Sequence, residues 1–181
     1  NYAQLIRLTS AGALDSGTTG FGSGGKLTLF NSSPWTNSYA NFVMQAEFTA
    51  TGDTNPLLLV GGQALAGSKG NFSLAGISTT GGVDDGLDTN FGTSSSGETT
   101  VNFGCSANSH AIHGCCGCFV PSVDSDYSLV CWEQGSMTAP WSIYGVGVSN
   151  YAESNGFALD RYTQSGTLDT SWAYNGLTDA Y

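Results

Sequence analysis

One phrase of the sequence occurs near both ends of the chain. The segment RLTSAGALD at residues 7–15 returns without a gap as RYTQSGTLD at residues 161–169, and each copy follows an apolar run. A looser copy lies between them, where residues 72–77 lead through a glycine-rich turn into Leu87 and Asp88. Self-similarity over a long period is typical of repeat architectures. The sequence therefore predicts three related units, because the copies are too far apart to belong to a single hairpin.

Each unit combines the same four pieces. An apolar strand is followed by a turn of the Ser/Thr-Gly-x-Leu-Asp type, a glycine-rich link that contains an aromatic residue, and a second strand. A carboxylate that recurs at the same place in every copy suits a structural task, such as accepting N–H groups of the turn, better than catalysis. The recurring turn residues are Gly12, Leu14, Asp15, Leu87, Asp88, Gly166, Leu168 and Asp169.

This unit resembles the delta-60 repeat of secreted, propeller-like proteins, whose unit ends in a phrase of the type FALARYNADGSLDTSFG. Residues 157–172 (FALDRYTQSGTLDTSW) are the closest match, and FGSGGK at 21–26 is similar to the link of that family. Residues 39–43 and 57–62 look like the two strands that open a unit. The resemblance implies an all-β, propeller-like repeat array of about ten antiparallel strands. It has too few blades to close, since a propeller needs at least four.

We expect residues 1–181 to form a single β-repeat domain. Its parts are a half-unit at 1–34, a full unit at 35–104 and a divergent, cysteine-rich unit at 105–181, in which the segment 105–134 has no counterpart and is taken as an insertion. Residues 39–48 have roughly helical spacing as well, but their aromatic and branched side chains favour a strand. The segment 127–132 is also expected to be a strand, although it has no place in the repeat. The other predicted strands are 2–8, 26–30, 57–60, 99–103, 143–148 and 157–163, and no helix is expected.

Composition excludes several classes of partner. Four basic residues stand against fourteen acidic ones, and the net charge of −10 repels nucleic acid and anionic lipid. No stretch reaches the roughly twenty apolar residues of a membrane-spanning helix. The sequence begins at Asn1 without an initiator Met, as expected if a signal peptide has been removed. Five cysteines and two glycosylation sequons, at Asn31 and Asn71, indicate an oxidising, extracellular compartment.

The densest chemical cluster is the cysteine and histidine segment. It contains His110, His113, Cys115, Cys116 and Cys118, and it is flanked by Cys105 and Cys131. Thiolates and imidazoles at such spacing can hold zinc or copper. In an extracellular chain we favour two disulfides with one thiol left over, of unknown pairing, and expect no metal and no cofactor. A Cys118 nucleophile with His113 as its base is a weaker hypothesis.

Three other features invite a functional interpretation. Asp84, Asp85 and Asp88 could bind calcium, but without the spacing of a known calcium loop a solvated turn is favoured. The glycine string at 20–25 precedes a strand rather than a helix, which argues against a dinucleotide site. Four tryptophans could stack on sugars, although packing is the more common role of such side chains; they are Trp35, Trp132, Trp141 and Trp172. With no catalytic motif, we expect no enzyme.

The sequence therefore favours an extracellular structural subunit that polymerises head to tail into a filament. Residues 2–8 match the phrase at 157–162, so the first strand would fit the same place in a neighbouring subunit by exchange of terminal strands. Its expected partners are other copies of itself and covalent glycans. The alternative is a secreted carbohydrate-binding or adhesive module, and an extracellular hydrolase is the weakest of the three hypotheses.

Overall fold

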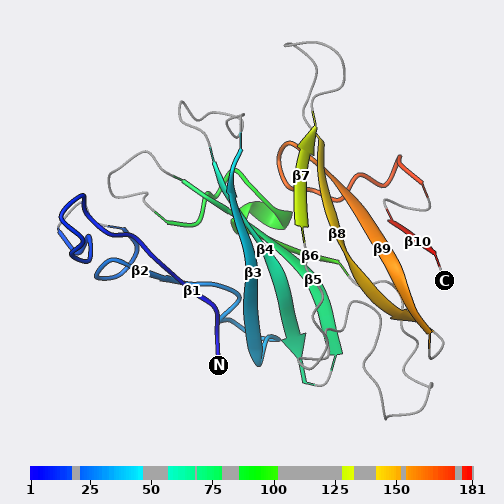
Figure 1. Cartoon of the computed structure of the whole chain (residues 1–181), viewed down its shortest axis with the longest axis horizontal. Coiled ribbons are helices and arrows are strands. Elements are labelled where there is room, and N and C mark those ends of the chain that lie inside the picture. The colour runs from blue at the N-terminus through cyan, green and yellow to red at the C-terminus, as the bar shows by residue number, and fades with distance from the viewer. Residues whose placement is uncertain are drawn as a thin grey trace.

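The computed structural model describes residues 1–17, 21–46, 57–67, 69–78, 86–101, 128–132, 142–151, 154–173 and 177–180. These residues form ten strands and one short 3-10 helix, η1 (Thr93–Ser95) (Figure 1). All of the pairings between strands are antiparallel. The predicted all-β class is confirmed for this part of the chain. Within the described part of the chain, no helix is long and apolar enough to cross a membrane.

The strands form three open sheets, each made of strands that are neighbours along the chain. The N-terminal sheet pairs β1 (Gln4–Ile6) with β2 (Lys26–Thr28). The central sheet runs β3 (Asn37–Gln45), β4 (Leu58–Ala66), β5 (Lys69–Ile77), β6 (Glu98–Val101). The C-terminal sheet runs β7 (Ser128–Trp132), β8 (Ser142–Tyr151), β9 (Ser154–Thr163), β10 (Leu177–Ala180). Each sheet lies within one of the three sections that the sequence delimits.

The last hairpin of every sheet has the same register. Residue pairs Ile6–Lys26, Ala75–Glu98 and Asp160–Leu177 stand at equivalent places in the hairpins β1/β2, β5/β6 and β9/β10. It follows that β4 and β8 are counterparts, as are β3 and β7, because each precedes its hairpin in the same order. The strand predicted at 127–132 thereby receives its place as the outer strand of the C-terminal sheet.

The segment with an ambiguous sequence pattern, residues 39–48, is a strand over its described part. It belongs to β3, which pairs with β4 along nearly its whole length and contains a register shift between Ala40 and Phe42. At this shift Gly62 lies against the carbonyl group of Tyr39, where a Cβ would have no room. The close approach of the two backbones accounts for the glycine in the middle of β4.

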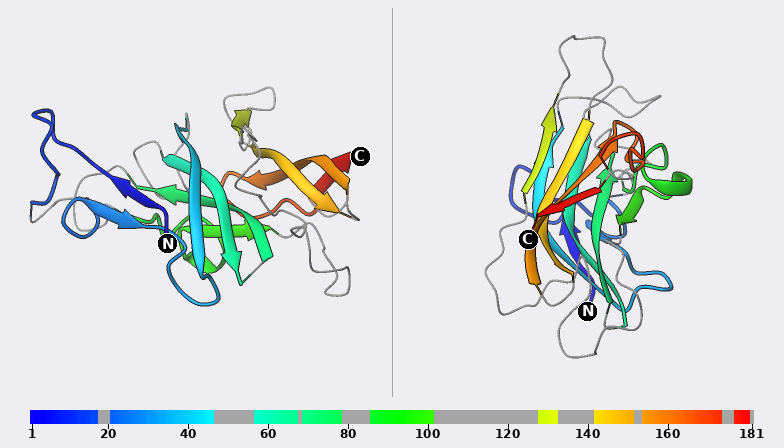
Figure 2. Two further views of the ribbon diagram at one scale, coloured as in Figure 1. Left: turned by 60° about the horizontal axis from the view of Figure 1, so that its bottom comes forward. Right: turned by 90° about the vertical axis from the view of Figure 1, so that its right-hand side faces the viewer.

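The three sheets follow one another from one end of the molecule to the other (Figures 1 and 2). Two clusters of buried apolar side chains lie between them. Side chains of β5 alternate between the two cores. Phe72 and Leu74 join Ile143 and Tyr162 of the C-terminal sheet, whereas Ile77 and its neighbour Ala75 face the N-terminal sheet. The central sheet therefore has both faces covered. The core toward the N-terminal sheet contains Phe21, Leu29, Phe30, Val60, Ala64, Ala75 and Ile77.

Polar contacts tie the N-terminal sheet to the central one. The buried Ser38 hydroxyl of β3 donates to the carbonyl of Leu29 at 2.7 Å and accepts the N–H of Ala3 at 2.9 Å. The N–H of Phe30 donates to Glu98 Oε1 of β6 at 2.6 Å. Burial raises the pKa of Glu98, and this hydrogen bond opposes the rise. Both sheets thus share hydrogen bonds as well as a core.

Candidate functional site

The three repeat turns have the same backbone hydrogen bonds. In every copy the N–H of the aspartate donates to the carbonyl eight to twelve residues earlier, at 2.8 to 2.9 Å, and a second backbone hydrogen bond crosses the turn in the opposite direction. The leucine before each aspartate forms an isolated antiparallel β-bridge with the residue that follows the carbonyl acceptor of the first bond. The bridged pairs are Leu8–Leu14, Ile77–Leu87 and Tyr162–Leu168. The donor–acceptor pairs of the first bond are Asp15–Arg7, Asp88–Gly76 and Asp169–Arg161.

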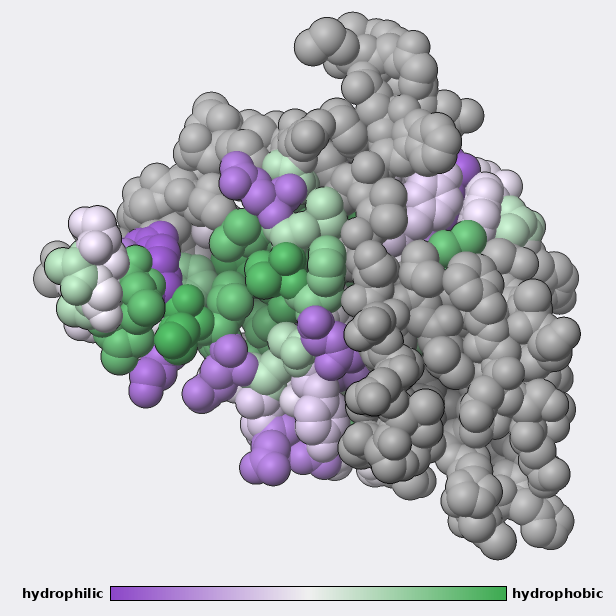
Figure 3. All heavy atoms as spheres, viewed as in Figure 1, coloured by the Kyte–Doolittle hydropathy of each residue, from purple (hydrophilic) through white to green (hydrophobic). Residues whose placement is uncertain are grey.

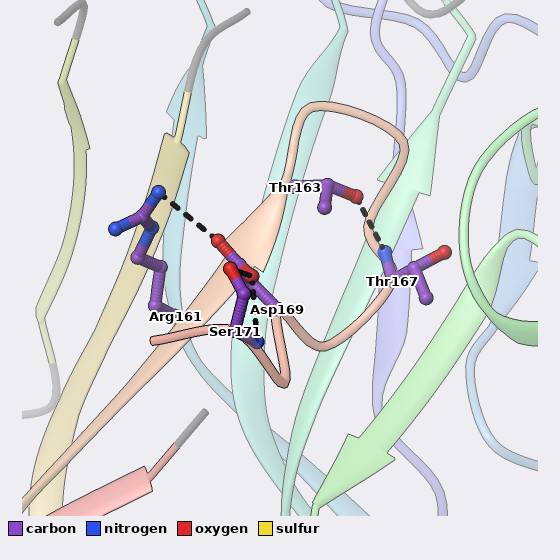
Figure 4. A network of polar contacts seen from close by, with 5 residues as sticks. All are labelled: Arg161, Thr163, Thr167, Asp169 and Ser171. Atoms are coloured by element: carbon purple, nitrogen blue, oxygen red, sulfur yellow. Dashed lines mark hydrogen bonds and ion pairs between the residues drawn. The ribbon is translucent and has the colours of Figure 1, made fainter. Parts of the chain in front are cut away.

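The carboxylate of Asp169 is held within its own turn (Figure 4). It accepts hydrogen bonds from the hydroxyl of Ser171 at 2.5 Å and from the N–H of Ser171 at 3.1 Å. It also pairs with the guanidinium of Arg161 at 3.0 Å. The hydroxyl bond of Ser171 is the main cause that lowers the pKa of Asp169, with Arg161 a smaller one. In the first copy Arg7 pairs with Asp15 in the same way, at 2.7 Å.

The central copy keeps the aspartate but has no arginine. Gly76 stands where the other copies have arginine, and the ring of Phe91 occupies the space that a side chain there would need. The buried Asp88 accepts the N–H of Asn90 at 2.8 Å. All three repeated carboxylates therefore bond to groups of their own unit.

The repeat turn of the C-terminal sheet docks on the central sheet. Gly166, with φ +75°, lies on the Phe91 ring, where a Cβ would come within 2.5 Å of the nearest ring carbon. Beside this contact the N–H of Gly92 donates to the carbonyl of Ser165 at 2.7 Å. Phe91 and Gly92 therefore form a socket on the central sheet, and the turn at Ser165 and Gly166 fills it.

The N-terminal sheet exposes a face that the other two sheets bury, which we call the tail face. It is formed by Ile6, Leu8 and Leu14, whose exposed fractions are 54%, 51% and 40%. Figure 3 shows hydrophobic side chains gathered over this end of the described molecule. The residues at the positions of Ile6 and Leu8 are fully or almost fully buried in the other sheets; they are Ala75 and Ile77, and Asp160 and Tyr162.

The outer edge of β1 is open in the described residues. Arg7 donates to Gly25 and Ala3 accepts from Leu29, so alternate backbone groups of β1 face β2. The N–H and C=O groups of Gln4, Ile6 and Leu8 then point away from it. The equivalent edges of β5 and β9 are paired, with β4 in the central sheet and with β8 in the C-terminal sheet. Sequence reasoning missed the tail face, because the exposure of Ile6 and Leu8 depends on which sheet comes first in the stack.

One buried acid lies between the central and C-terminal sheets. Asp160 is completely buried and accepts the hydroxyl of Tyr162 through Oδ2 at 2.5 Å. Its other oxygen lies against Gly145 of β8, where any larger residue would collide with it. Burial raises the pKa of Asp160 to about 7 although the hydrogen bond from Tyr162 lowers it, and burial raises the pKa of Tyr162 well above its usual value.

Several predicted site residues fall outside what the structure describes. The cysteine and histidine cluster at 105–118, both acids Asp84 and Asp85, and Trp141 are among them, as are the side chains of Cys131 and Trp132. Among the described residues, no group of three or more His, Cys, Asp or Glu could hold a metal ion. The disulfide and metal hypotheses therefore stay predictions.

The remaining aromatic and sequon residues have defined places. Trp35 packs on the N-terminal core, edge to face with Phe30 at 6.4 Å between ring centres. Trp172 meets Tyr144 in the same geometry at 5.7 Å on the face of the C-terminal sheet that points away from the central sheet. Asn31 is exposed after β2, whereas Asn71 is half-buried in β5 opposite Ala64. The geometry suits a glycan better at Asn31.

Comparison with protein-family models, with curated proteins and with solved structures finds no match to this chain. The function must therefore be argued from the geometry of the chain itself. Its distinguishing features are the open edge of β1, the tail face, and a C-terminal sheet whose outer face carries Tyr144 and Trp172.

Proposed function

We propose that this protein is an extracellular structural subunit that polymerises head to tail into a filament through its terminal β-strands. The observation that carries the proposal is the open outer edge of β1, whose counterparts in β5 and β9 are both paired. The three sheets are then blades of a propeller-like array that does not close, with a cysteine-rich insertion in the third. The pairing of β1 with β2 inside its own chain leaves this edge available to a neighbour.

The edge lacks the usual protection against pairing. Unpaired N–H and C=O groups on a strand are a template for another strand, and proteins commonly block such edges with charges or proline. The outward positions Gln4, Ile6 and Leu8 carry neither, and the nearby Arg7 is paired with Asp15. An interface between the two different ends of the subunit is heterologous, so it propagates as a filament unless the rotation closes a ring. An edge of this kind is expected of a polymerising subunit.

The extracellular location and the glycan are part of the same proposal. Their support is the low content of charged residues, 10%, together with five cysteines and the exposed sequon at Asn31. The alternative, a carbohydrate-binding module, is favoured by one observation. Tyr144 and Trp172 are partly exposed aromatic neighbours, and such rings can stack on a sugar.

Proline substitution of an outward N–H tests the proposal. Gln4→Pro removes an N–H that faces away from β2, so β1 keeps its partner and loses the ability to pair outward. Val43→Pro is the matched control, because Val43 lies on the edge strand β3, is 52% exposed and also directs its N–H away from its partner strand. In sedimentation velocity we expect large polymers for the unmodified protein and for Val43→Pro, and monomers for Gln4→Pro.

Two results would count against this function. Polymers of Gln4→Pro equal to those of the unmodified protein would show that the β1 edge is not used. The carbohydrate-binding alternative would be favoured if the unmodified protein stayed monomeric at all concentrations and bound defined sugars on a glycan array.

A further inference from the structure

We infer that the tail face of one copy stacks on the outer face of the C-terminal sheet of the next copy, repeating the contact between the central and C-terminal sheets. The inference rests on the proposed head-to-tail polymer and adds a face-to-face contact to the pairing at the edge of β1. The internal repeat supplies the template, since each sheet in the chain turns the same face toward the sheet before it.

The positions that form the tail face are covered in the other two sheets. Ala75 and Ile77 of the central sheet face the N-terminal sheet, and Tyr162 of the C-terminal sheet faces the central sheet. Their counterparts in the N-terminal sheet are Ile6 and Leu8, which lie on no preceding sheet in the described chain. The tail face thus consists of apolar side chains at positions that are covered in both of the other sheets of this molecule.

The surface that would cover the tail face lies on the C-terminal sheet. On the central sheet, Leu59, Leu74 and Phe91 form the core that receives the C-terminal sheet. Each has a counterpart on the outer face of the C-terminal sheet. Gly76 and Arg161 are equivalent positions of the repeat, and they pair with Leu59 and Tyr144, so the two sheets can be aligned residue by residue. These counterparts are Tyr144, Leu159 and Trp172, and all three are partly exposed. The outer face of the C-terminal sheet therefore has side chains at the same positions as the face of the central sheet that receives the C-terminal sheet.

The socket and the turn that fills it also have counterparts elsewhere in the chain. Trp172 and Ala173 repeat the positions of Phe91 and Gly92: the N–H of each aromatic residue bonds to the aspartate of its turn, and Ala173 keeps a positive φ of +46°. Ala11 and Gly12 repeat the positions of Ser165 and Gly166. Gly12 has φ +81° and no atom within 4 Å of a Cβ placed on it, whereas Gly166 lies against Phe91. The turn that fills the socket inside the chain thus has a counterpart at Gly12, beside which the described part of the chain leaves open space, and the socket has a counterpart at Trp172 and Ala173.

A second copy is the occupant that these observations favour. Both halves of the contact are present on one chain, the turn near its start and the socket near its end. The tail face carries no charge, so contact of this face buries no unpaired ion despite the net charge of −10 on each subunit. Stacking would continue the series of sheets across subunits with the same contact that already joins two sheets within one.

Asparagine at Gly12 tests the socket. Asparagine tolerates a positive φ better than other residues with a side chain, so the change adds volume with little strain. Gly67→Asn is the matched control, because Gly67 has φ +66° and equally free space but lies on the β4–β5 turn. We expect Gly12→Asn to raise the critical concentration of polymerisation about tenfold or more, as for the loss of about 1.4 kcal/mol per contact, and Gly67→Asn to leave it nearly unchanged.

A second pair of variants guards against misfolding of the first. Leu8→Glu places a charge on the tail face and should abolish polymerisation, whereas Val43→Glu, at a similarly exposed position on β3, should not. Thermal unfolding of each monomer checks that it is folded. If Gly12→Asn and Leu8→Glu polymerise like their controls, the stacking is wrong but the filament remains. If the unmodified protein forms no polymer, the proposed function fails and this interface fails with it.

Discussion

Asp160 occupies a position where the central sheet has Ala75, and its carboxyl group lies in the interior between two sheets. A carboxylate without solvent is costly there, so burial favours the protonated form and raises the pKa to about 7. Gly145 on the neighbouring strand provides the space that the carboxyl group needs. We therefore expect the contact between the central and C-terminal sheets to depend on pH through this side chain.

We predict that stability falls as the pH rises from about 4 to about 7. In this window the unfolded chain has lost the proton of Asp160, whose ordinary pKa is 3.8, while the folded chain retains it with a pKa of about 7. The stabilisation is complete below the unfolded pKa and is lost as the pH passes the folded one. Because one pKa unit corresponds to about 1.4 kcal/mol, the effect is on the order of 4 kcal/mol.

Urea unfolding of the Asp160→Asn variant measures this effect. Asparagine has the same shape and can still accept the hydroxyl of Tyr162, but it does not titrate. We expect the free energy of unfolding of the variant, relative to the unmodified protein, to rise between pH 4.5 and pH 7.5. The acids common to both proteins, such as Asp169 with its lowered pKa, cancel in this difference. A difference that is independent of pH would show that Asp160 does not titrate in this window.

At the scale of elements, the attachment of the N-terminal sheet depends on few polar groups. A two-stranded sheet has marginal stability by itself. It is therefore held by the core around Phe21 and Leu29 and by the hydroxyl of Ser38, which bonds both to Leu29 and to Ala3. Loss of this hydroxyl leaves a buried carbonyl and a partly buried N–H without their partner.

Ser38→Ala should lower the free energy of unfolding by about 1–3 kcal/mol, the usual cost of leaving a buried polar group unpaired. Ser32→Ala is the control, since Ser32 is exposed on the loop that follows β2. The two midpoints of urea unfolding give the comparison directly. Equal midpoints would mean that the bonds of Ser38 do not hold the N-terminal sheet.

The elements that could be predicted from sequence are those with local signals. The repeated phrase marks the turns at Asp15, Asp88 and Asp169, and its hydrogen bonds close within each unit. The strand β7 was expected as a strand, but its place was not, because pairing with β8 depends on residues distant in the chain. The exposure of Ile6 could not be predicted either, because the residues at the same position of the other two repeats are buried. For Asp160 the only signal was an acidic residue inside an apolar phrase.

The whole molecule is a series of three sheets with different ends. Its first sheet exposes a tail face and an open strand edge, and its last sheet ends in a partly exposed aromatic face. Inside the chain, the corresponding faces of the central and C-terminal sheets pack on each other. We propose that a filament extends this contact from one subunit to the next, beside the pairing at the edge of β1, and this is the central claim of our account.

Electron microscopy of the purified protein tests that claim most directly. The sample should contain enough salt to screen the net charge of −10, which opposes association of identical subunits. We predict unbranched filaments for the unmodified protein and dispersed particles for Gly12→Asn under the same conditions. Dispersed particles or closed rings of the unmodified protein would contradict the filament.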